Sequence, residues 1–193
     1  MLSYRKLAMR VLGRPLHTGG IDSPRPASQR AAAFILTAAM LTTLAAPAFA
    51  DIWRIEDGDI TVKAGETKGT NKVSQGTTID KVDTNTIITG TSDTNTVTID
   101  TSKGNVDVTF DDLNIDASSR NEAAMSVTGS GNTTIKLDGD NHLTGGNGDT
   151  YGGDGIASTG SLTISGGETD SLTAQGGSGA NGGDGITSSG SLT

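Results

Sequence analysis

Cysteine is absent from the 193-residue chain, and aromatic residues make up only 3% of it. Without cysteine no disulfide can cross-link the fold, so its stability must come from packing and from backbone hydrogen bonds. Large apolar residues are sparse as well, whereas glycine occurs 28 times. Low hydrophobicity combined with high charge is typical of disordered chains, and only a regular pattern in the sequence argues against disorder here.

Basic residues are scarce after residue 50. Six of the 14 lysines and arginines precede residue 51, but only one of the 22 acidic residues does. Residues 51–193 therefore hold eight basic and 21 acidic residues, a formal charge of −13. This balance argues against nucleic acid, which needs clusters of Lys and Arg, and against anionic membrane surfaces. A divalent cation or a neutral glycan is compatible with it.

The first fifty residues have the pattern of a secretory signal peptide. A basic segment precedes the apolar run "AAAFILTAAMLTTLAA" (31–46), and the small residues Ala48 and Ala50 precede Asp51. This pattern predicts cleavage between Ala50 and Asp51 and a secreted or cell-surface protein. The run is shorter than the about 20 residues that a membrane-spanning helix needs, so we expect no span in the mature chain. An uncleaved membrane anchor is the alternative.

Apolar and polar residues alternate after residue 95, which predicts β-strands with one buried face. The alternating segments are rich in Val, Ile and Thr and are separated by Gly, Asn, Asp and Ser, the residues of turns. They include "TVTID" (96–100), "VDVTF" (106–110), "TIKL" (134–137) and "LTI" (162–164). This regularity argues against disorder.

Related segments recur every 27 to 31 residues, a period typical of solenoids. Like residues at this spacing are Val108 and Ile135, Phe110 and Leu137, Val127 and Ile156, Leu143 and Leu172, Ile156 and Ile186, and Leu162 and Leu192. One such unit cannot bury its apolar residues alone, but stacked units can. The sequence therefore predicts an all-β, right-handed parallel β-helix with coils of about 27–31 residues.

The expected organisation has three parts: the signal peptide at 1–50, an N-terminal cap with a first irregular coil at 51–95, and regular coils at 96–193. Trp53 and Ile55 are the expected cap residues. The final "GSLT" (190–193) matches "GSLT" (160–163), which continues into "ISGG". No polar cap follows, so we expect a solenoid truncated at its C-terminus.

The phrases "KLDGDNHLTGG" (136–146) and "GSLTISGG" (160–167) resemble those of exported, Gly/Thr-rich bacterial β-helix proteins described as carbohydrate-binding domain-containing. The resemblance covers roughly residues 96–193. It implies a β-helix on the cell surface, with a glycan or a host-surface ligand as partner. These motifs reflect coil geometry, so carbohydrate binding follows from the resemblance alone.

Catalytic residues are hard to assemble from this sequence. Asp111 and Asp112, like Asp138 and Asp140, form carboxylate pairs, but each pair ends a strand, where Asp is common in turns. After residue 50 the chain offers one histidine, His142, and few basic residues besides. No nucleophile, base and orienting group combine into a constellation, and we expect no catalytic activity.

Calcium is the one cofactor that the sequence suggests. The segments "GGNGDTYGGDGI" and "GGSGANGGDGI" partly match the calcium-binding nonapeptide repeat. The Gly-Gly pairs within the segments are seven and six residues apart, and after Gly152-Gly153 the pattern lapses for over twenty residues. Asp149, Asp154 and Asp184 are therefore predicted as weak calcium ligands at most.

The expected function is that of a secreted or cell-surface, non-enzymatic β-solenoid, acting as an adhesin-like or carbohydrate-binding scaffold. Two alternatives stay open at this stage. One is a polysaccharide-degrading β-helix enzyme whose catalytic face lies in missing coils, and the other is a passive structural stalk.

Overall fold

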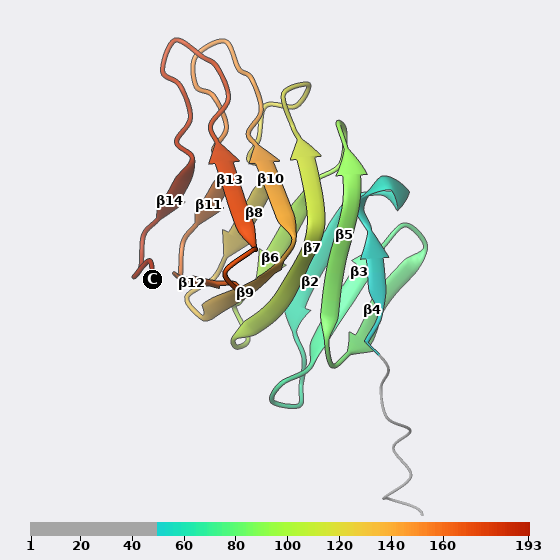
Figure 1. Cartoon of the computed structure of the whole chain (residues 1–193). Coiled ribbons are helices and arrows are strands. Elements are labelled where there is room, and N and C mark those ends of the chain that lie inside the picture. The colour runs from blue at the N-terminus through green and yellow to red at the C-terminus, as the bar shows by residue number, and fades with distance from the viewer. Residues whose placement is uncertain (1–49) are drawn as a thin grey trace, which may run out of the picture. The chain divides into compact units, whose positions relative to one another are not determined.

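The computed structural model describes residues 50–193, which belong to one compact unit, Pro47–Thr193. This part of the chain contains fourteen strands and one short 3-10 helix, η1 (Ile55–Asp57), so the all-β prediction is confirmed (Figure 1). None of its helices is long and apolar enough to cross a bilayer. The predicted signal peptide lies outside the described residues, except for Ala50.

One sheet is purely parallel. Its main path runs β1-β5-β7-β10-β13, and β9 and β12 extend it from the first half of β7. Its strands are β1 (Ile52–Arg54), β5 (Thr86–Ser92), β7 (Val106–Asp116), β9 (Asn132–Asp138), β10 (Asp140–Thr144), β12 (Ser161–Ser165) and β13 (Ser171–Gln175).

The second sheet is mixed, in the order β14-β11-β8-β6-β2-β3-β4. The pairs from β14 to β2 are parallel, whereas β2-β3 and β3-β4 are antiparallel. Its strands are β2 (Ile60–Ala64), β3 (Asn71–Gln75), β4 (Thr78–Asp83), β6 (Val97–Asp100), β8 (Met125–Thr128), β11 (Ile156–Ser158) and β14 (Ile186–Ser188).

The predicted right-handed parallel β-helix is wrong. The described chain forms two seven-stranded sheets, and the mixed one begins with an antiparallel β2-β3-β4 meander. The local reason is turn chemistry between residues 60 and 83. Gly76, with φ +56°, and Thr77 form a two-residue hairpin loop between Gln75 and Thr78, which reverses the chain directly.

Several of the predicted residue pairs are nevertheless present in the parallel ladders. Val108 pairs with Ile135, Phe110 with Leu137, Ile156 with Ile186, and Leu162 with Leu192. Two predicted pairs are wrong by two residues, because Ile156 pairs with Met125 and Leu143 pairs with Ala174. Strand pairing thus links segments that lie about one repeat of 27 to 31 residues apart. The spacing of like residues predicts the register of some pairs but not of all.

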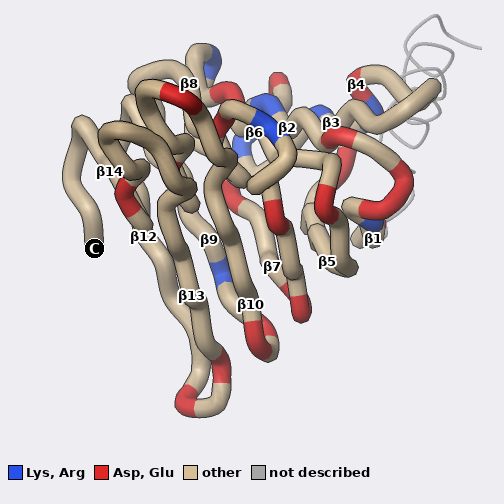
Figure 2. The backbone as a smooth tube through the Cα atoms, turned by 90° about the horizontal axis from the view of Figure 1, so that it is seen from above, with Lys and Arg blue, Asp and Glu red and all other residues tan. Residues whose placement is uncertain are grey.

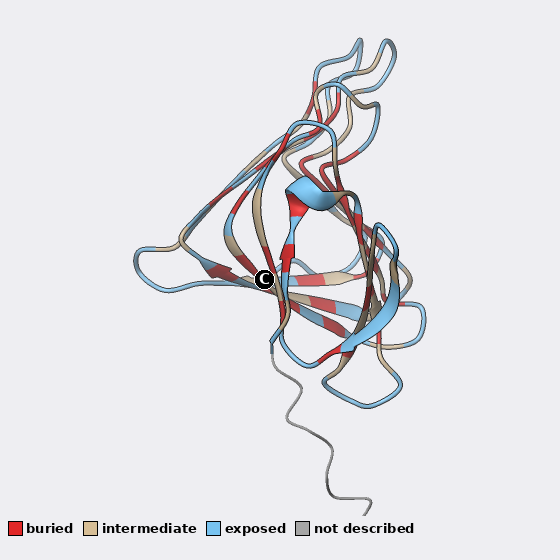
Figure 3. Cartoon of the chain, turned by 90° about the vertical axis from the view of Figure 1, so that its right-hand side faces the viewer, coloured by how far each residue is buried: buried red, intermediate tan, exposed pale blue. Residues whose placement is uncertain are grey.

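The apolar core lies between the inner faces of the two sheets (Figure 3). Alternate residues of β7 are buried, including Val106, Val108, Phe110, Leu113 and Ile115. The intervening residues of β7 face outward. One strand therefore supplies both core packing and a polar outer surface.

β7 bends where its pairing partner changes. Val106–Asp111 pair with β9, and Asn114–Asp116 pair with β10. The register against β5 shifts between Thr89 and Gly90, which leaves Asp112, at φ +48°, as an extra residue. Such a β-bulge kinks the strand and redirects its side chains.

The Asn141 side chain pairs with one backbone group beside this bulge and with backbone carbonyl groups of neighbouring segments. Its side chain is fully buried, and its Oδ1 accepts the Leu113 N–H at 3.0 Å. Its Nδ2 lies within hydrogen-bond distance of three carbonyl oxygens, those of Asp138, Gly139 and Ser171. A buried amide that pairs fully with backbone groups avoids a desolvation penalty, which explains the "LDGDN" phrase structurally.

Two glycine-rich loops, residues 145–155 and 176–185, project together from one end of the sheets (Figure 1). Backbone hydrogen bonds join them, for example from Gly148 N to Ser178 O at 2.9 Å and from Gly152 N to Asn181 O at 2.8 Å. An added Cβ at Gly146 would overlap the carbonyl oxygen of Arg120, and one at Gly177 would overlap that of Gly146. These glycines are needed for close backbone approach.

Replacing Ile156 by aspartate should lower the melting temperature far more than replacing Ala157. Ile156 is fully buried between Met125 and Ile186, whereas Ala157 faces outward in the same strand. An unpaired carboxylate in this core costs on the order of several kcal/mol. Thermal denaturation of Ile156→Asp and Ala157→Asp measures the difference, and equal melting temperatures would refute the assignment of the inward face.

Candidate functional site

A polar groove of about 850 Å³ lies where η1, the carboxyl ends of β5, β7 and β10, and the segment after β5 come together. Its lining consists of hydroxyl, amide, carboxylate and imidazole groups. The lining residues are Glu56, Thr91, Ser92, Asp93, Thr94, Asn95, Asn114, Asp116, His142 and Thr144.

The floor of the groove is made by outward-facing residues in register. Thr91 of β5 pairs with Asn114 of β7, and Asn114 pairs with His142 of β10. Two residues further along, Asp116 pairs with Thr144. Neighbouring strands lie about 4.7–4.9 Å apart, so these side chains form two short rows that run across the strands.

Both rows continue onto the next strand. His142 pairs with Thr173 of β13, and Thr144 pairs with Gln175. Thr173 and Gln175 are exposed. The polar surface of the floor therefore extends beyond the groove in the direction perpendicular to the strands.

Glu56 occupies the η1 side of the groove because Gly90 leaves room for it. An added Cβ at Gly90, which has φ +99°, would overlap the Glu56 carboxylate. Glu56 Oε1 accepts the Thr91 N–H at 3.0 Å. This bond is the main cause that lowers the pKa of Glu56 from its ordinary value, and Arg54 contributes a smaller lowering.

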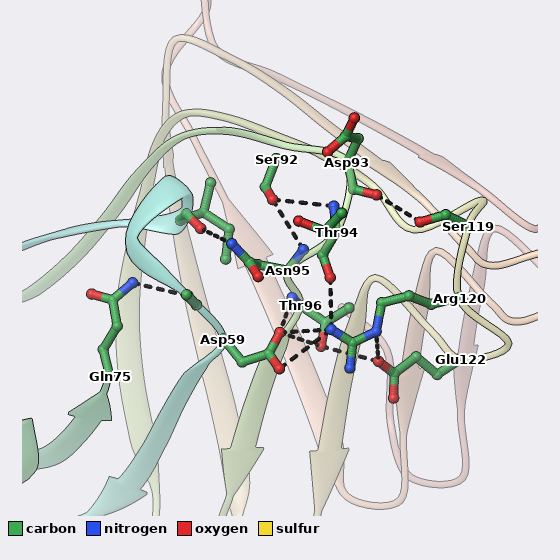
Figure 4. Close-up of polar contacts among 12 residues, drawn as sticks. Asp59, Gln75, Ser92, Asp93, Thr94, Asn95, Thr96, Ser119, Arg120 and Glu122 are labelled. Carbon is green, nitrogen blue, oxygen red and sulfur yellow. Dashed lines mark hydrogen bonds and ion pairs between the residues drawn. The ribbon is translucent and has the colours of Figure 1, made fainter. Parts of the chain in front are cut away.

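Another wall is the segment Ser92–Thr96, which folds around the Ser92 hydroxyl (Figure 4). Ser92 Oγ accepts the N–H groups of Thr94 at 3.3 Å and Asn95 at 3.0 Å. Asn95 Nδ2 donates to Ile55 O at 2.8 Å, and Thr96 N donates to Asp59 Oδ1 at 2.8 Å. The wall is thus tied to η1 and to the start of β2.

Arg120, which does not line the groove, anchors this wall through the polar contacts drawn in Figure 4. Its Nη1 donates to Thr94 O at 2.6 Å and to Asp59 Oδ1 at 2.9 Å, and its Nε pairs with Glu122. Ser119 Oγ donates to Asp93 O at 2.8 Å. The turn at 117–124 therefore fixes the backbone of a segment whose side chains face the groove.

The electrostatic character of the groove is acidic. Glu56, Asp93 and Asp116 line it, and its lining includes no lysine or arginine. Hydrogen bonds from Ser118 lower the pKa of the Asp116 carboxyl from its ordinary value. The bond from the Ser118 hydroxyl has the larger effect and the bond from its backbone N–H the smaller. Glu56 and Asp116 are therefore ionised at neutral pH and act as hydrogen-bond acceptors.

Two of the three predicted calcium ligands, Asp154 and Asp184, accept hydrogen bonds within the protein through their carboxylates. Asp154 Oδ1 accepts the Asp184 N–H at 2.8 Å, which links the two glycine-rich loops. Asp149 lies in a shallow depression with Asn147, Gly148, Ser178 and Gly179. Within residues 50–193 no group of three or more His, Asp or Glu residues is placed to hold a metal ion, so the calcium hypothesis gains no support.

The two predicted aspartate pairs lie in different places. Asp138 ends β9 and Asp140 begins β10, on either side of a turn at Gly139, whereas Asp111 and Asp112 lie inside β7 at its bulge, so the prediction that this pair ends a strand is wrong. Asp112 Oδ1 accepts the Asp140 N–H at 3.0 Å, and Asp140 Oδ1 accepts the Ser171 hydroxyl at 2.8 Å. Asp170 Oδ1 accepts the Gly139 N–H at 3.2 Å. Figure 2 shows the resulting row of acidic turns near β10 and β13. These carboxylates connect the bulge of β7 to the turns that follow β9 and β12.

Of the groove residues, sequence reasoning singled out only His142, as the one histidine after residue 50. Glu56, Asp93, Asn95, Asn114 and Asp116 were missed. They come from three distant segments, and each has the polar character expected at an ordinary exposed strand position or turn. The one available signal was Gly90 within a strand-like segment, since such a glycine often marks a bulge or a close approach.

No protein-family model, no curated protein and no solved structure matches the chain.

Replacing Arg120 by methionine should loosen the Ser92–Thr96 wall without unfolding the protein. Methionine keeps the apolar stem but loses every donor to Thr94, Asp59 and Glu122. Amide hydrogen exchange at Asn95 and Thr96 should become severalfold faster.

The matched control is Lys136→Met, which removes one positive charge from an exposed site on β9. It should leave exchange at Asn95 and Thr96 unchanged. Unchanged exchange in Arg120→Met as well would show that Arg120 does not hold the wall.

Proposed function

We propose that the chain is an exported, non-enzymatic scaffold that binds a linear, uncharged glycan in the polar groove. The observation that carries this proposal is the pair of rows, one across β5, β7 and β10 and one across β7 and β10. They present hydroxyl, amide, imidazole and carboxylate groups in register. Sugar hydroxyls donate and accept hydrogen bonds, and these side chains supply both kinds of partner.

The direction of the rows favours an extended ligand. The rungs repeat at the strand spacing of about 4.7–4.9 Å, which is close to the length of one sugar unit in an extended chain. Thr173 and Gln175 continue the rows outside the groove. A linear glycan lying across the strands could therefore contact successive rungs with successive sugar units.

The charge of the groove favours an uncharged ligand over an anionic one. Glu56, Asp93 and Asp116 would repel carboxylated or sulfated sugars, and no lysine or arginine of the lining offsets them. Within residues 50–193, Trp53 and Phe110 are buried and Tyr151 is outside the groove. Binding would therefore depend on hydrogen bonds distributed over several sugar units, without an aromatic platform.

The state of the carboxylates supports binding over catalysis. Glu56 and Asp116 both accept backbone N–H groups, and both have lowered pKa values. A general acid for glycoside hydrolysis needs the opposite, a raised pKa that keeps its proton. Ionised carboxylates in fixed positions can accept hydrogen bonds from the hydroxyl groups of a ligand.

The contacts of Asp51 support the proposed export. Its backbone nitrogen lies 3.4 Å from Oδ1 of the buried Asp83, and its carboxylate pairs with Lys81 at 2.9 Å. Cleavage after Ala50 would convert this nitrogen into an ammonium group beside a buried carboxylate, a favourable arrangement.

Protein recovered from the exported fraction of an expressing bacterium should begin at Asp51. N-terminal sequencing measures this directly. A mature protein that begins elsewhere, or that keeps the apolar run 31–46, would contradict the proposed cleavage.

The glycan proposal is tested with an array of neutral and anionic linear oligosaccharides, followed by calorimetry on those that bind. His142→Ala and Asn114→Ala should each weaken binding by about three- to tenfold, the cost of one or two ordinary hydrogen bonds. Thr163→Ala, at an exposed position of β12 outside the groove, is the matched control and should bind normally.

Three other outcomes would each contradict part of the glycan-binding proposal. Binding that ignores the His142 and Asn114 substitutions would place the ligand elsewhere. Release of reducing ends from a bound glycan would indicate an enzyme. Failure of every neutral glycan to bind would favour a passive structural role.

A further inference from the structure

The chain contains two Asn-Gly sequences, Asn147-Gly148 and Asn181-Gly182, one in each glycine-rich loop. Asn-Gly is the sequence most prone to deamidation, because glycine has no Cβ to obstruct attack by its amide nitrogen on the asparagine side chain. Both asparagines are exposed. Sequence alone therefore treats them as equivalent, but their hydrogen bonds differ.

In Asn147-Gly148 both reacting groups, the Gly148 nitrogen and the Asn147 side chain, are held by hydrogen bonds. The Gly148 N–H, which would supply the attacking nitrogen, donates to Ser178 O at 2.9 Å. Asn147 Oδ1 accepts the Ser178 N–H at 2.7 Å. Attack would require both bonds to break, because the side chain must turn toward Gly148 N and that nitrogen must lose its proton.

Asn181-Gly182 has no such restraint at the attacking nitrogen. Among the hydrogen bonds of residues 50–193, none has the Gly182 N–H as donor. The side chain of Asn181 makes one long contact, from Nδ2 to Thr150 O at 3.4 Å. Exposure of Asn181 and Gly182 also gives water access to this loop.

We propose that Asn181 is a site of spontaneous deamidation and that the fold protects Asn147 from the same reaction. The Gly182 nitrogen attacks Asn181 Cγ, its proton passes to solvent, and the side-chain nitrogen leaves as ammonia after gaining a proton from water. The resulting succinimide is opened by water at either carbonyl, which gives aspartate or isoaspartate. No oxidant or reductant takes part.

The product alters the contact between the two loops. Asn181 N donates to Thr150 O at 2.9 Å, and Asn181 O accepts the Gly152 N–H at 2.8 Å. An isoaspartyl linkage routes the backbone through the side chain, so it moves the carbonyl group that Gly152 uses. It also adds a negative charge, and the outer loop should separate from residues 150–152.

The test ages the folded full-length protein at mildly alkaline pH and maps its peptides by mass spectrometry. A protease that cuts before aspartate places the two asparagines in separate peptides, 140–148 and 170–183. It also cuts before a new aspartate at 181 but not before isoaspartate. Deamidation of Asn147 requires two hydrogen bonds to break first, which slows it. Asn181 is therefore expected to deamidate about tenfold faster or more.

Two controls make the comparison decisive. In denaturant both Asn-Gly sequences should react at similar rates, because the fold no longer distinguishes them. Gly182→Ala should suppress reaction at Asn181 without unfolding the loop, since the added Cβ meets only Gly177 O, at 3.7 Å.

Equal rates for Asn147 and Asn181 in the folded protein would overturn the proposal. So would an Asn181 that stays intact in the folded protein while the denatured chain is converted. Unchanged deamidation at Asn181 in Gly182→Ala would show that Gly182 nitrogen is not the attacking group.

Discussion

Parallel backbone pairing in a fixed register is the constraint on which the rest of this structure depends. The chain has no disulfide, and its large apolar residues are few. Ladders such as Val97-Met125-Ile156-Ile186 align these residues on the inner faces of the sheets. Inward-facing and outward-facing residues alternate along the same paired strands. The register that aligns the core residues therefore also aligns the residues of the outer surface.

The groove follows directly from this register. Asn114, His142 and Thr173 lie in one row only because β7, β10 and β13 pair as they do. The bulge at Asp112 adjusts the register of β7 against β5, and Gly90 beside it makes room for Glu56. The wall at Ser92–Thr96 then depends on Arg120, a residue outside the groove itself.

Sequence reasoning identified strands such as β6, β7, β9 and β12, but it did not identify β3 or the arrangement of the strands. Alternation predicts which residues of β7 or β9 face inward, and it does so correctly. A slip of two residues preserves that alternation, so it cannot decide whether Ile156 pairs with Met125 or with Val127. The antiparallel meander depends on the local turn at Gly76, and the groove joins segments whose polar residues look ordinary in isolation. The sequence pattern does not contain the pairing register of distant strands or the geometry of local turns, and the arrangement depends on both.

The register can be measured directly by nuclear Overhauser contacts between backbone protons of paired strands. The structure predicts contacts of Asn114 with His142 and of His142 with Thr173, together with those of Ile156 with Met125. Contacts that join Ile156 to Val127, or His142 to residues two positions away from Asn114 and Thr173, would contradict the register and with it the rows that form the groove.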